Sequence, residues 1–504
     1  MLLNSLINGQ SHMNRDSMLK NAEQTPYWDV IVIGGGASGL WCAYDAALRG
    51  YKTILIEQGD FACSTSSKST KLIHGGVRYL KQGHLTLVRE ALLERRYLSL
   101  NAPHLVSSRS FVIPYYRAHE RLMYGLGMGI YDFFAGPMGN EMHRYLPPNE
   151  ILKKCPTLRT DQLRGGCLFN DGQFDDSRFA IEIAKMAHHS GGTLLNYVKA
   201  SSLIKQGGKI VGVEAKDLIN DTLMELTGKV VINATGIFAD QIRKMDDKNV
   251  PKMMSLARGS HIVLDRQFLP LETAIVIPKT SDNRIAFMIP WHHKVLVGTT
   301  DIETNHPLRE AAPTHEEIDF LLDASGYYLN KRPKREDVLS AFAGIRPLVK
   351  KSIKSTAKLS RTHKVMMSDS GMISLLGGKW TTGRKMAEDT IDYAIYAGHL
   401  ERSLCLTHRM PFEGTSLLHK GEPLHPSLPY TEDDLEIAID HEMVQDLTDL
   451  LARRTRSLLL DARATLEIAP KVATKLQKKL MHTDAWRHEQ VEKFKTFAGS
   501  YILK

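Results

Sequence analysis

The clearest hydrophobic pattern in the chain lies close to its N-terminus. Residues 30–33 are apolar and β-branched, which is typical of a buried strand. Residues 40–49 then have the composition of a helix, and Gly50 follows where a helix would end. Residues 53–56 form a second apolar run, which stops at Glu57. This order predicts a strand, a turn, a helix and a second strand, as in a nucleotide-binding α/β unit.

The turn after the first predicted strand contains three glycines in the order G-x-G-x-x-G, at Gly34, Gly36 and Gly39. Gly34 allows the tight turn, Gly36 lets the backbone approach a pyrophosphate, and Gly39 lets the helix pack against the strand. The helix N-terminus favours the anion, and Glu57 is the expected acceptor for the ribose hydroxyls. A glycine-rich loop without function is the alternative, and the motif alone does not distinguish FAD from NAD.

The residues after Glu57 have the polarity of a loop beside a phosphate-bearing ligand. Residues 64–71 have the sequence S-T-S-S-K-S-T-K, whose hydroxyl and N–H groups can line a cofactor. Residues 72–76 then place Gly75 and Gly76 directly after His74. Two adjacent glycines here indicate a close approach of the backbone to a flat ligand.

Composition places the chain among ordinary globular proteins of two or three domains. It has 504 residues, of which 43% are hydrophobic and 24% are charged. Its five cysteines are scattered without a C-x-x-C pair, which argues for a reducing compartment and against a disulfide framework or a metal site. The net charge of +9 suits phosphorylated metabolites or anionic lipid, but no basic run interleaved with aromatic residues indicates a nucleic-acid surface.

Two stretches bear on membranes and export. Residues 1–27 are polar and lack a secretory signal, and we expect a flexible tail there. Residues 122–135 are apolar and aromatic and follow Arg117 and Arg121, but they are too short to span a bilayer. Two alternatives stay open for them: a buried core helix, or an interfacial segment with aromatic residues at the membrane boundary. These aromatic residues are Tyr124, Tyr131, Phe133 and Phe134.

Four motifs carry a resemblance to a known family. The run S-S-K-S-T-K-L-I-H-G-G-V-R-Y-L at 66–80 resembles the FAD-dependent glycerol-3-phosphate dehydrogenases. The resemblance continues at 171–178 (D-G-Q-F-D-D-S-R), at 234–236 (A-T-G) and at 377–384 (G-G-K-W-T-T-G-R). It extends, with gaps, over nearly the whole chain from residue 28. The family has Tyr where this chain has Gly383, so no role is transferred to that position.

The resemblance implies a two-lobed α/β flavoprotein with a C-terminal helical domain. A strand that ends in A-T-G is a second signature of FAD-binding lobes, and it moves the choice from NAD to FAD. The strand-rich pattern from residue 255 predicts a mostly antiparallel substrate lobe. We expect a discontinuous FAD-binding domain at 28–116, 165–254 and 341–398, a substrate-binding lobe at 117–164 and 255–340, and a helical domain at 411–504. The motif L-A-R-R-T-R at 451–456 favours a solvated basic face over a phosphate site.

The implied reaction is oxidation of sn-glycerol 3-phosphate to dihydroxyacetone phosphate, with the C2 hydride passed to flavin N5 and electrons then passed to a membrane quinone. Such chemistry needs a base for the hydroxyl proton and fixed cations for the phosphate. His261 is the preferred base and His74 the alternative, while Arg78, Arg346 and Lys379 are expected to bind the phosphate and the developing oxyanion. Tyr79 completes the predicted substrate site.

The residues expected to bind FAD lie in the glycine turns, the polar loop and the second nucleotide signature. They are Gly34, Gly36, Ser38, Gly39, Glu57, Ser66, Ser67, Lys71, Leu72, His74, Gly75, Gly76, Val198, Ala234, Thr235, Gly236, Gly378, Lys379 and Thr381.

Other functions remain as alternatives at this stage. One is a glycerol-3-phosphate oxidase that reduces oxygen, although this chain lacks the extra substrate-lobe segment usual in family oxidases. Others are an FAD-dependent tRNA-modifying protein and a flavin-binding membrane scaffold without turnover. We expect a cytoplasmic protein attached peripherally to the cytoplasmic face of an anionic membrane, with no nucleic-acid partner and with a homodimer left open.

Overall fold

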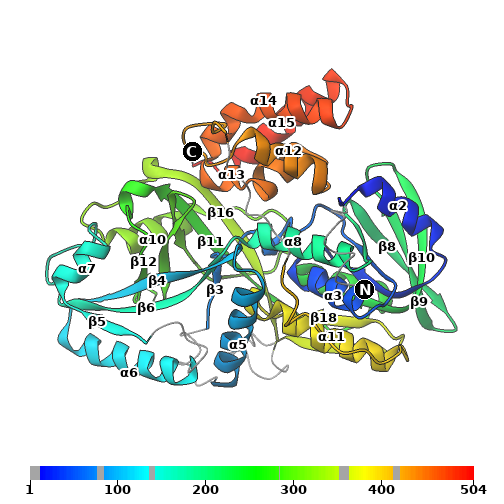
Figure 1. The fold of residues 1–504 in the computed structure, drawn as a ribbon, viewed down its shortest axis with the longest axis horizontal. Helices are drawn as coiled ribbons and strands as arrows, with labels where there is room; N and C mark the ends of the chain where they lie inside the picture. Colours follow the sequence, from blue (N-terminus) through cyan, green and yellow to red (C-terminus); the bar gives the residue numbers. More distant parts are fainter. Residues whose placement is uncertain are drawn as a thin grey trace.

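The computed structural model of the protein describes residues 12–75, 85–135, 142–282, 284–350, 363–412 and 421–503. Figure 1 shows a sheet with its helices on the right, a second sheet on the left, and a group of C-terminal helices above both. The cleft that forms the candidate site lies where the two sheets meet.

The first sheet has the strand order β17-β18-β10-β1-β2-β7, and the hairpin of β8 and β9 continues from β10. Its central pairs are parallel, and only the edge strand β17 on this path runs antiparallel. Its strands are β1 (Trp28–Ile33), β2 (Thr53–Ile56), β7 (Thr193–Leu195), β8 (Val198–Gln206), β9 (Lys209–Asp217), β10 (Thr222–Asn233), β17 (Lys364–Met367) and β18 (Ile373–Leu376).

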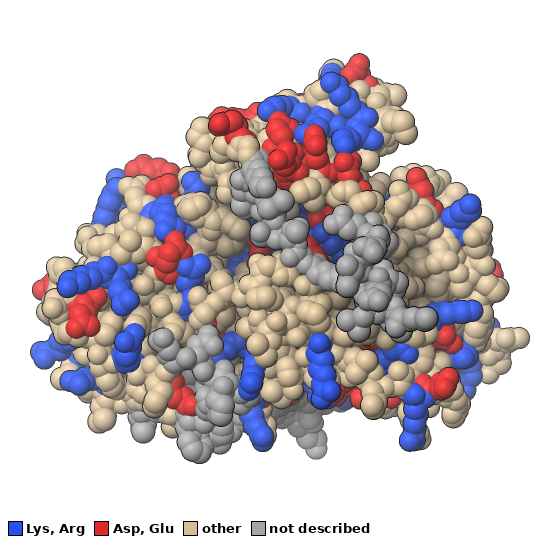
Figure 2. Space-filling model, in the orientation of Figure 1, with Lys and Arg blue, Asp and Glu red and all other residues tan. Residues whose placement is uncertain are grey.

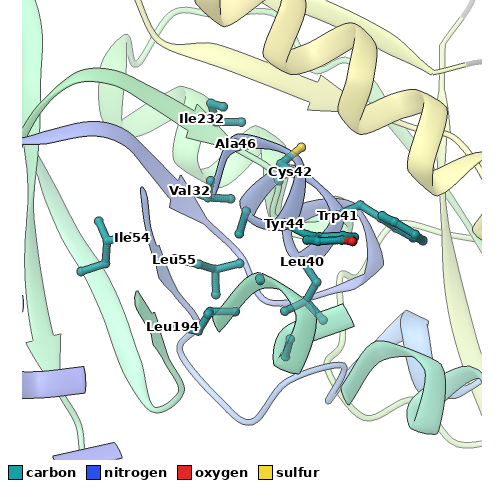
Figure 3. Close-up of a cluster of buried hydrophobic side chains, with 14 of the residues drawn as sticks. Val32, Leu40, Trp41, Cys42, Tyr44, Ala46, Ile54, Leu55, Leu194 and Ile232 are labelled. Carbon is teal, nitrogen blue, oxygen red and sulfur yellow. The ribbon is translucent and has the colours of Figure 1, made fainter. Parts of the chain in front are cut away.

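Helix α3 (Ala37–Leu48) forms the centre of the core over this sheet, as the hydrophobic pattern predicts. Its buried side chains, such as Leu40, lie beside Val32 and Leu55 of the neighbouring parallel strands (Figure 3). Helices α8 (Asp176–His189) and α11 (Gly383–Ala397) pack against α3. This packing fixes the N-terminus of α3 above the carboxyl ends of the strands, where nucleotides bind in such sheets.

The second sheet has the strand order β15-β11-β14-β13-β12-β4-β6-β3, with β16 paired to β11 and β5 paired to β6. All pairs are antiparallel except β12 with β4. Its strands are β3 (Leu72–Ile73), β4 (Val106–Tyr115), β5 (Arg144–Leu146), β6 (Gly165–Phe174), β11 (Met254–Asp265), β12 (Ala274–Ile277), β13 (Ala286–Trp291), β14 (Lys294–Gly298), β15 (Ile302–Thr304) and β16 (Val338–Val349).

The second sheet corrects the predicted domain boundaries. Residues 106–115 and 165–174 were assigned to the FAD-binding domain, but they form β4 and β6 of the second sheet. Residues 341–349 belong to β16, which pairs with β11 of the same sheet. A local pattern predicts that a segment is a strand, but its partners come from distant segments that the pattern does not identify.

The N-terminal segment is also more ordered than expected. Residues 15–24 form helix α2 (Arg15–Gln24), whose first turn is capped by the side chain of Asn14. The buried guanidinium of Arg15 donates to Asp217 at 2.7 Å, and this ion pair attaches α2 to β9. The prediction of a flexible tail is therefore wrong for residues 12–24, and residues 1–11 lie outside the described part. The polar composition of residues 1–27 hides two attachments of α2: this distant ion pair, and the burial of Met18, Leu19 and Ala22 in the core of the first sheet.

The C-terminal helices follow a start signal that the sequence predicts correctly. Thr431 and Asp434 form a capping box at the start of α12 (Glu432–His441). A π-helical turn, η7 (Asp449–Arg454), leads to α13 (Ser457–Leu460), α14 (Ala462–Lys479) and α15 (Asp484–Gly499). Their apolar core includes Trp291 and Phe342 of the second sheet, so these helices are packed firmly onto it.

Helix α6 (Ala118–Ala135) decides part of the question about residues 122–135. Met128 is buried and Tyr124 packs against the same core, whereas Leu122 and Met123 are 79% and 56% exposed. The segment therefore combines a core face with an exposed apolar face. The side chains of Tyr131, Phe133 and Phe134 lie outside the described residues.

The remaining helices connect these parts. They are α5 (Leu85–Asn101), α7 (Pro148–Lys154), α9 (Ala239–Asp246), α10 (His315–Gly326) and the short turns η1 (Thr65–Ser67), η3 (Gly236–Phe238), η4 (Arg266–Phe268), η5 (Arg335–Asp337) and η6 (Trp380–Thr382). Within the described ranges, none of the helices has the length and apolar composition to cross a membrane.

Candidate active site

The glycine turn between β1 and α3 has the close packing that its motif predicts. Gly34 has a positive φ of 112°, and a Cβ on Gly39 would overlap the carbonyl oxygen of Gly34. Gly36 is the N-cap of α3 and has no side chain to cover the helix N-terminus. The backbone N–H of Ala37 donates to Ser66 Oγ at 2.9 Å, which brings the polar loop to the same place. The turn is therefore built for an anionic ligand at the start of α3.

Glu57 lies at the end of β2 with its carboxylate held by two backbone groups. The N–H groups of Gly35 and Gly59 donate to it at 2.7 and 2.8 Å. Burial raises the pKa of Glu57, and these two hydrogen bonds oppose that shift. The thiol of Cys63 also lies 3.8 Å from Oε1 of Glu57, and because a carboxylate has about four acceptor positions, capacity remains for a ribose hydroxyl.

One long cleft starts at this turn and runs to the second sheet. Of the residues predicted to bind cofactor or substrate, those on its wall are Gly34, Gly36, Ser38, Glu57, Ser66, Leu72, His74, Val198, Ala234, Thr235, Gly236, His261, Arg346, Gly378, Lys379 and Thr381. Residues separated by more than 340 positions thus meet in one cavity, with the nucleotide signatures and the candidate catalytic residues side by side. This arrangement fits an extended ligand such as FAD, with its reactive end toward the second sheet.

Three predicted cofactor residues face elsewhere. The Lys71 ammonium is buried and pairs with Asp176 at 2.6 Å, while Ser67 gives its carbonyl oxygen to Lys71. The N–H of Gly75 donates to the carboxylate of Asp171. The prediction that Ser67, Lys71 and Gly75 line the cofactor site is therefore corrected, because these hydrogen bonds hold the three residues away from the cleft. Gly39 lies behind the wall and acts through packing.

Gly76, Arg78 and Tyr79 lie outside the described residues, so their predicted roles stay predictions.

Lys68 and Thr70 line the cleft although the sequence analysis assigned them no role. Lys68 is buried and paired with Glu310, and burial together with the charge of Arg453 lowers its pKa to about 7. Thr70 Oγ1 lies 3.0 Å from Nε2 of His261. The polar composition of this loop does not show which of its residues face the cleft.

His261 has the environment of a neutral base. It lies on β11 and is only 1% exposed, and its ring stacks on Phe342 at 5.0 Å between centroids. Burial lowers the pKa of His261 well below its ordinary value, and the charges of Lys71 and Arg346 lower it further. A neutral imidazole at pH 7 has a free lone pair and can accept a proton.

Arg346 is held across the surface of the second sheet. Its guanidinium donates to the carbonyl oxygen of Thr300 at 3.0 Å and to Thr299 Oγ1 at 2.9 Å, and it pairs with Asp301 at 3.0 Å. Arg346 pairs in register with Ala257 of β11, and a Cβ on Gly259, two residues further along β11, would overlap its guanidinium. The guanidinium is thus fixed before a ligand arrives, with its side chain 25% exposed to the cleft.

Besides the glycine turns at residues 34–39 and at Gly236, a third glycine turn at Gly377 and Gly378 brings Lys379 to the cleft between β18 and α11. Gly378 has a positive φ of 88°, which a side chain would strain. Lys379 follows as the N-cap of η6, so the backbone N–H groups of this turn start a helical segment at the cleft wall. The positive charge of Lys379 therefore lies on the wall of the same cleft as His261 of β11.

Family models match almost the whole chain. Residues 29–384 match the model described as FAD dependent oxidoreductase, and residues 401–487 match the C-terminal domain of alpha-glycerophosphate oxidase. The first match covers all three glycine turns, and the second covers most of the C-terminal helices.

Named relatives agree with these models. The mitochondrial glycerol-3-phosphate dehydrogenase of Saccharomyces cerevisiae is 39% identical over 77% of this chain and 66% of its own length. The corresponding mouse protein is 34% identical over 95% of this chain and 74% of its own length. An X-ray structure of glycerol-3-phosphate dehydrogenase from Bacillus halodurans complexed with FAD superposes with a TM-score of 0.79 at 28% identity, covering 97% of this chain and 98% of that one. These matches confirm the predicted α/β fold and FAD cofactor, and they show that the chain is an FAD-dependent oxidoreductase that belongs to the glycerol-3-phosphate dehydrogenase family.

Proposed function

We propose that the protein oxidises sn-glycerol 3-phosphate to dihydroxyacetone phosphate and passes the electrons to a membrane quinone. The observation that carries the proposal is that a buried neutral imidazole and two cationic side chains share one cleft with the FAD-binding turns. The names of the relatives support the substrate. Bound FAD supplies the hydride acceptor for this reaction.

The imidazole of His261 removes the proton of the C2 hydroxyl in this proposal. Its lowered pKa keeps the ring neutral at physiological pH, and the hydroxyl of Thr70 fixes its orientation through Nε2. His74, which is half-buried on the same wall, is the alternative base. Substitution of each histidine by Asn separates the two, since loss of a general base slows a reaction by roughly 10²–10⁴-fold.

Arg346 and Lys379 bind the anionic parts of the substrate. A planar guanidinium suits a phosphate because it contacts two oxygens at once, and Arg346 already has a fixed orientation. Lys379 lies on the FAD side of the cleft and stabilises negative charge that develops during oxidation. Arg78 is expected to be the second phosphate ligand.

The quinone and the membrane belong to the proposal because α6, at the lower left of Figure 1, combines exposed apolar residues with basic residues near its start. Leu122, Met123 and Ile130 of α6 are exposed, and the exposed Arg117 and Arg121 are close to them in the sequence. Lys and Arg side chains project along the lower edge of the face drawn in Figure 2, while the C-terminal helices carry basic and acidic side chains together. Such a surface suits peripheral contact with the cytoplasmic face of an anionic membrane. The proposal includes no oligomeric state, so a homodimer is neither required nor excluded.

A two-part measurement tests the proposal. The purified holoprotein is mixed anaerobically with sn-glycerol 3-phosphate, and flavin absorbance is followed; bleaching is expected, and unchanged absorbance would refute the substrate. The reduced protein is then given a soluble quinone analogue or oxygen. Faster reoxidation by quinone supports the dehydrogenase, whereas fast reoxidation by oxygen with stoichiometric hydrogen peroxide would identify the oxidase alternative.

A further inference from the structure

Three arginines of the C-terminal part are buried, although the sequence predicts a solvated basic face for them. Arg453 is 6% exposed, and Arg454 and Arg456 are each 1% exposed. They lie in and just after the π-helical turn η7. Removing a guanidinium from water costs several kcal/mol unless partners replace the water. The groups that these three arginines contact therefore indicate the structural role of the π-helical turn.

Arg453 and Arg454 hold the loop at the adenosine end of the cleft. Arg454 donates to both carboxylate oxygens of Asp60, at 2.6 and 2.9 Å, and Arg453 Nε donates to the same carboxylate at 2.6 Å. Burial alone would raise the pKa of Asp60, but Arg454 and Arg453 lower it below its ordinary value. Asp60 lies three residues after Glu57, so these two arginines fasten the part of the loop beside the ribose acid.

Arg456 reaches the other end of the same loop. It has a positive φ of 52°, and its Nη1 donates to the carbonyl oxygen of Ala452 at 2.6 Å. Its Nη2 donates to the carbonyl oxygen of Ser67 at 2.6 Å and to Asp176 Oδ1 at 3.1 Å. One guanidinium of the C-terminal part thus joins the FAD-side loop to the N-terminus of α8.

Asp176 passes this constraint to the residues beside the candidate base. Its second oxygen, Oδ2, accepts the N–H and Oγ–H of Ser69 at 2.9 and 2.7 Å and pairs with Lys71 at 2.6 Å. Thr70 lies between these two anchored residues, and its Oγ1 is the group that contacts Nε2 of His261. The position of the Thr70 hydroxyl is therefore set from both sides.

We infer that Arg456 is a positioning residue for the active site: through Ser67 and Asp176 it fixes Thr70, and Thr70 orients the imidazole of His261. The C-terminal helices then complete the oxidoreductase site without contacting the substrate. The inference rests on the proposed function only where it concerns the rate of the reaction. The link from Arg456 to His261 is a property of the folded holoprotein.

The test compares Arg456→Met with wild type in three measurements. FAD content and melting temperature report folding, and stopped-flow absorbance reports flavin reduction by sn-glycerol 3-phosphate. We expect the maximal reduction rate to fall by about 10²-fold, a loss that a displacement of a reacting group by about 1 Å can cause. The substrate concentration for half-maximal rate should change less than threefold, because no phosphate ligand is touched. Thr70→Val should give a similar loss, and the double variant should be no slower than the slower single variant.

A matched control removes an arginine contact of the same domain that does not reach the loop. Arg463 of α14 donates to the carbonyl oxygen of Val338 at 3.2 Å. Arg463→Met should lower the melting temperature without slowing flavin reduction. If it slows reduction as much as Arg456→Met does, or if the losses of Arg456→Met and Thr70→Val multiply, the inference is wrong. Should Arg456→Met fail to fold, Arg456→Lys replaces it, since lysine keeps the charge but contacts fewer acceptors.

Nuclear magnetic resonance of ¹⁵N-histidine-labelled holoprotein separates this inference from the proposed function. The Nε2 signal of His261 is identified by its loss in His261→Asn, and we expect Arg456→Met to move it in the same direction as Thr70→Val does. An unmoved signal overturns the inference, whatever the substrate is. Conversely, a moved signal with no flavin reduction in wild type would leave the positioning intact and refute the substrate.

Discussion

A Cβ on Gly383 would lie 2.9 Å from Cδ1 of the Trp41 indole, so the first residue of α11 and a ring of α3 share one space. In the family motif that residues 377–384 resemble, G-G-K-x-T-T-Y-R, this position is expected to be Tyr. Trp41 is 1% exposed and lies in an aromatic cluster with Phe179 and Phe412, at 6.2 and 5.8 Å between ring centroids. The indole therefore fills the volume that a larger side chain at position 383 would need. The absence of a side chain at Gly383 is matched to the size of Trp41.

This relationship predicts that Gly383→Tyr destabilises the protein. Overpacking of a filled core costs about 1–3 kcal/mol, which should lower the melting temperature. Trp41→Ala alone should cost about 3–5 kcal/mol. The double variant should be more stable than Trp41→Ala, because the phenol enters the space that the indole leaves. Scanning fluorimetry of the FAD-saturated proteins measures all three, and Gly499→Tyr, at an open position of α15, is the matched control. Strictly additive losses would contradict the shared space.

Gly298→Ala should impair catalysis more than folding. A Cβ on Gly298 would overlap Cδ2 of the His261 ring, which would have to move away from Thr70. We expect flavin reduction by sn-glycerol 3-phosphate to slow by about 10²-fold with FAD content near that of wild type. The loss should not exceed that of His261→Asn. Stopped-flow absorbance gives the rates, and Gly499→Ala is a control that should behave like wild type. Normal flavin reduction in Gly298→Ala would show that the His261 ring does not need this position for catalysis.

Arg346→Ala should discriminate between phosphorylated and unphosphorylated substrates. The guanidinium is fixed by Thr299, Thr300 and Asp301, so its loss removes a prepared anion contact. We expect kcat/KM for sn-glycerol 3-phosphate to fall by an amount that corresponds to a loss of about 2–4 kcal/mol of transition-state stabilisation. The low activity on glycerol should stay nearly unchanged. Equal losses on both substrates would mean that Arg346 acts on the flavin or the fold. Arg335→Ala, at an exposed pair with Asp319, controls for the loss of an arginine.

The parts of the site that the sequence predicts are those whose signal is local. The three glycine turns, Glu57 and the capping box at Thr431 each depend on residues within one or two turns of chain, so their sequence pattern determines their geometry. His261 and Arg346 were placed by family motifs, and the structure brings both to the cleft.

The parts that the sequence does not predict depend on distant partners. Lys71 resembles a cofactor ligand by position, but Asp176, 105 residues away, draws its ammonium out of the cleft. Arg456 resembles a surface residue by composition, yet it is buried because Ser67, 389 residues away, accepts its hydrogen bond. The sheet of β4 and β6 was misassigned for the same reason. Contacts between distant residues depend on the whole fold, so a local sequence pattern does not predict them.

Acid should weaken the junction between α8 and the C-terminal helices. Burial alone would raise the pKa of Glu442, but the charges of Arg178, Lys185 and Arg454 lower it well below its ordinary value. The unfolded chain therefore binds a proton that the folded protein does not, and stability present above about pH 4.3 is lost as the pH falls toward the folded pKa. The melting temperature should thus decline below about pH 4.5.

Glu442→Gln tests which group causes this decline. It should lower stability at pH 7 by about 3–5 kcal/mol, because it leaves Arg178 and Arg454 with an uncharged partner. Its melting temperature should then depend less steeply on pH between 3 and 5 than that of wild type. Thermal unfolding over pH 3–7 measures both effects, and an unchanged slope would assign the acid sensitivity to other carboxylates. Glu467→Gln, at an exposed site beside His425, is the control.

The exposed face of α6 should mediate membrane contact without spanning the bilayer. Leu122 and Met123 are 79% and 56% exposed beside Arg117 and Arg121, so binding should have an apolar part and an electrostatic part. Leu122→Ser with Met123→Ser should reduce co-sedimentation with anionic vesicles and turnover with a membrane quinone, and high salt should release part of the wild-type protein. Flavin reduction by sn-glycerol 3-phosphate should persist, because that half-reaction needs no membrane. Leu223→Ser removes an equally apolar side chain, 66% exposed on β10, and should leave vesicle binding unchanged. If the α6 variant binds vesicles like wild type, α6 is not the contact, and the C-terminal helices become the next surface to substitute.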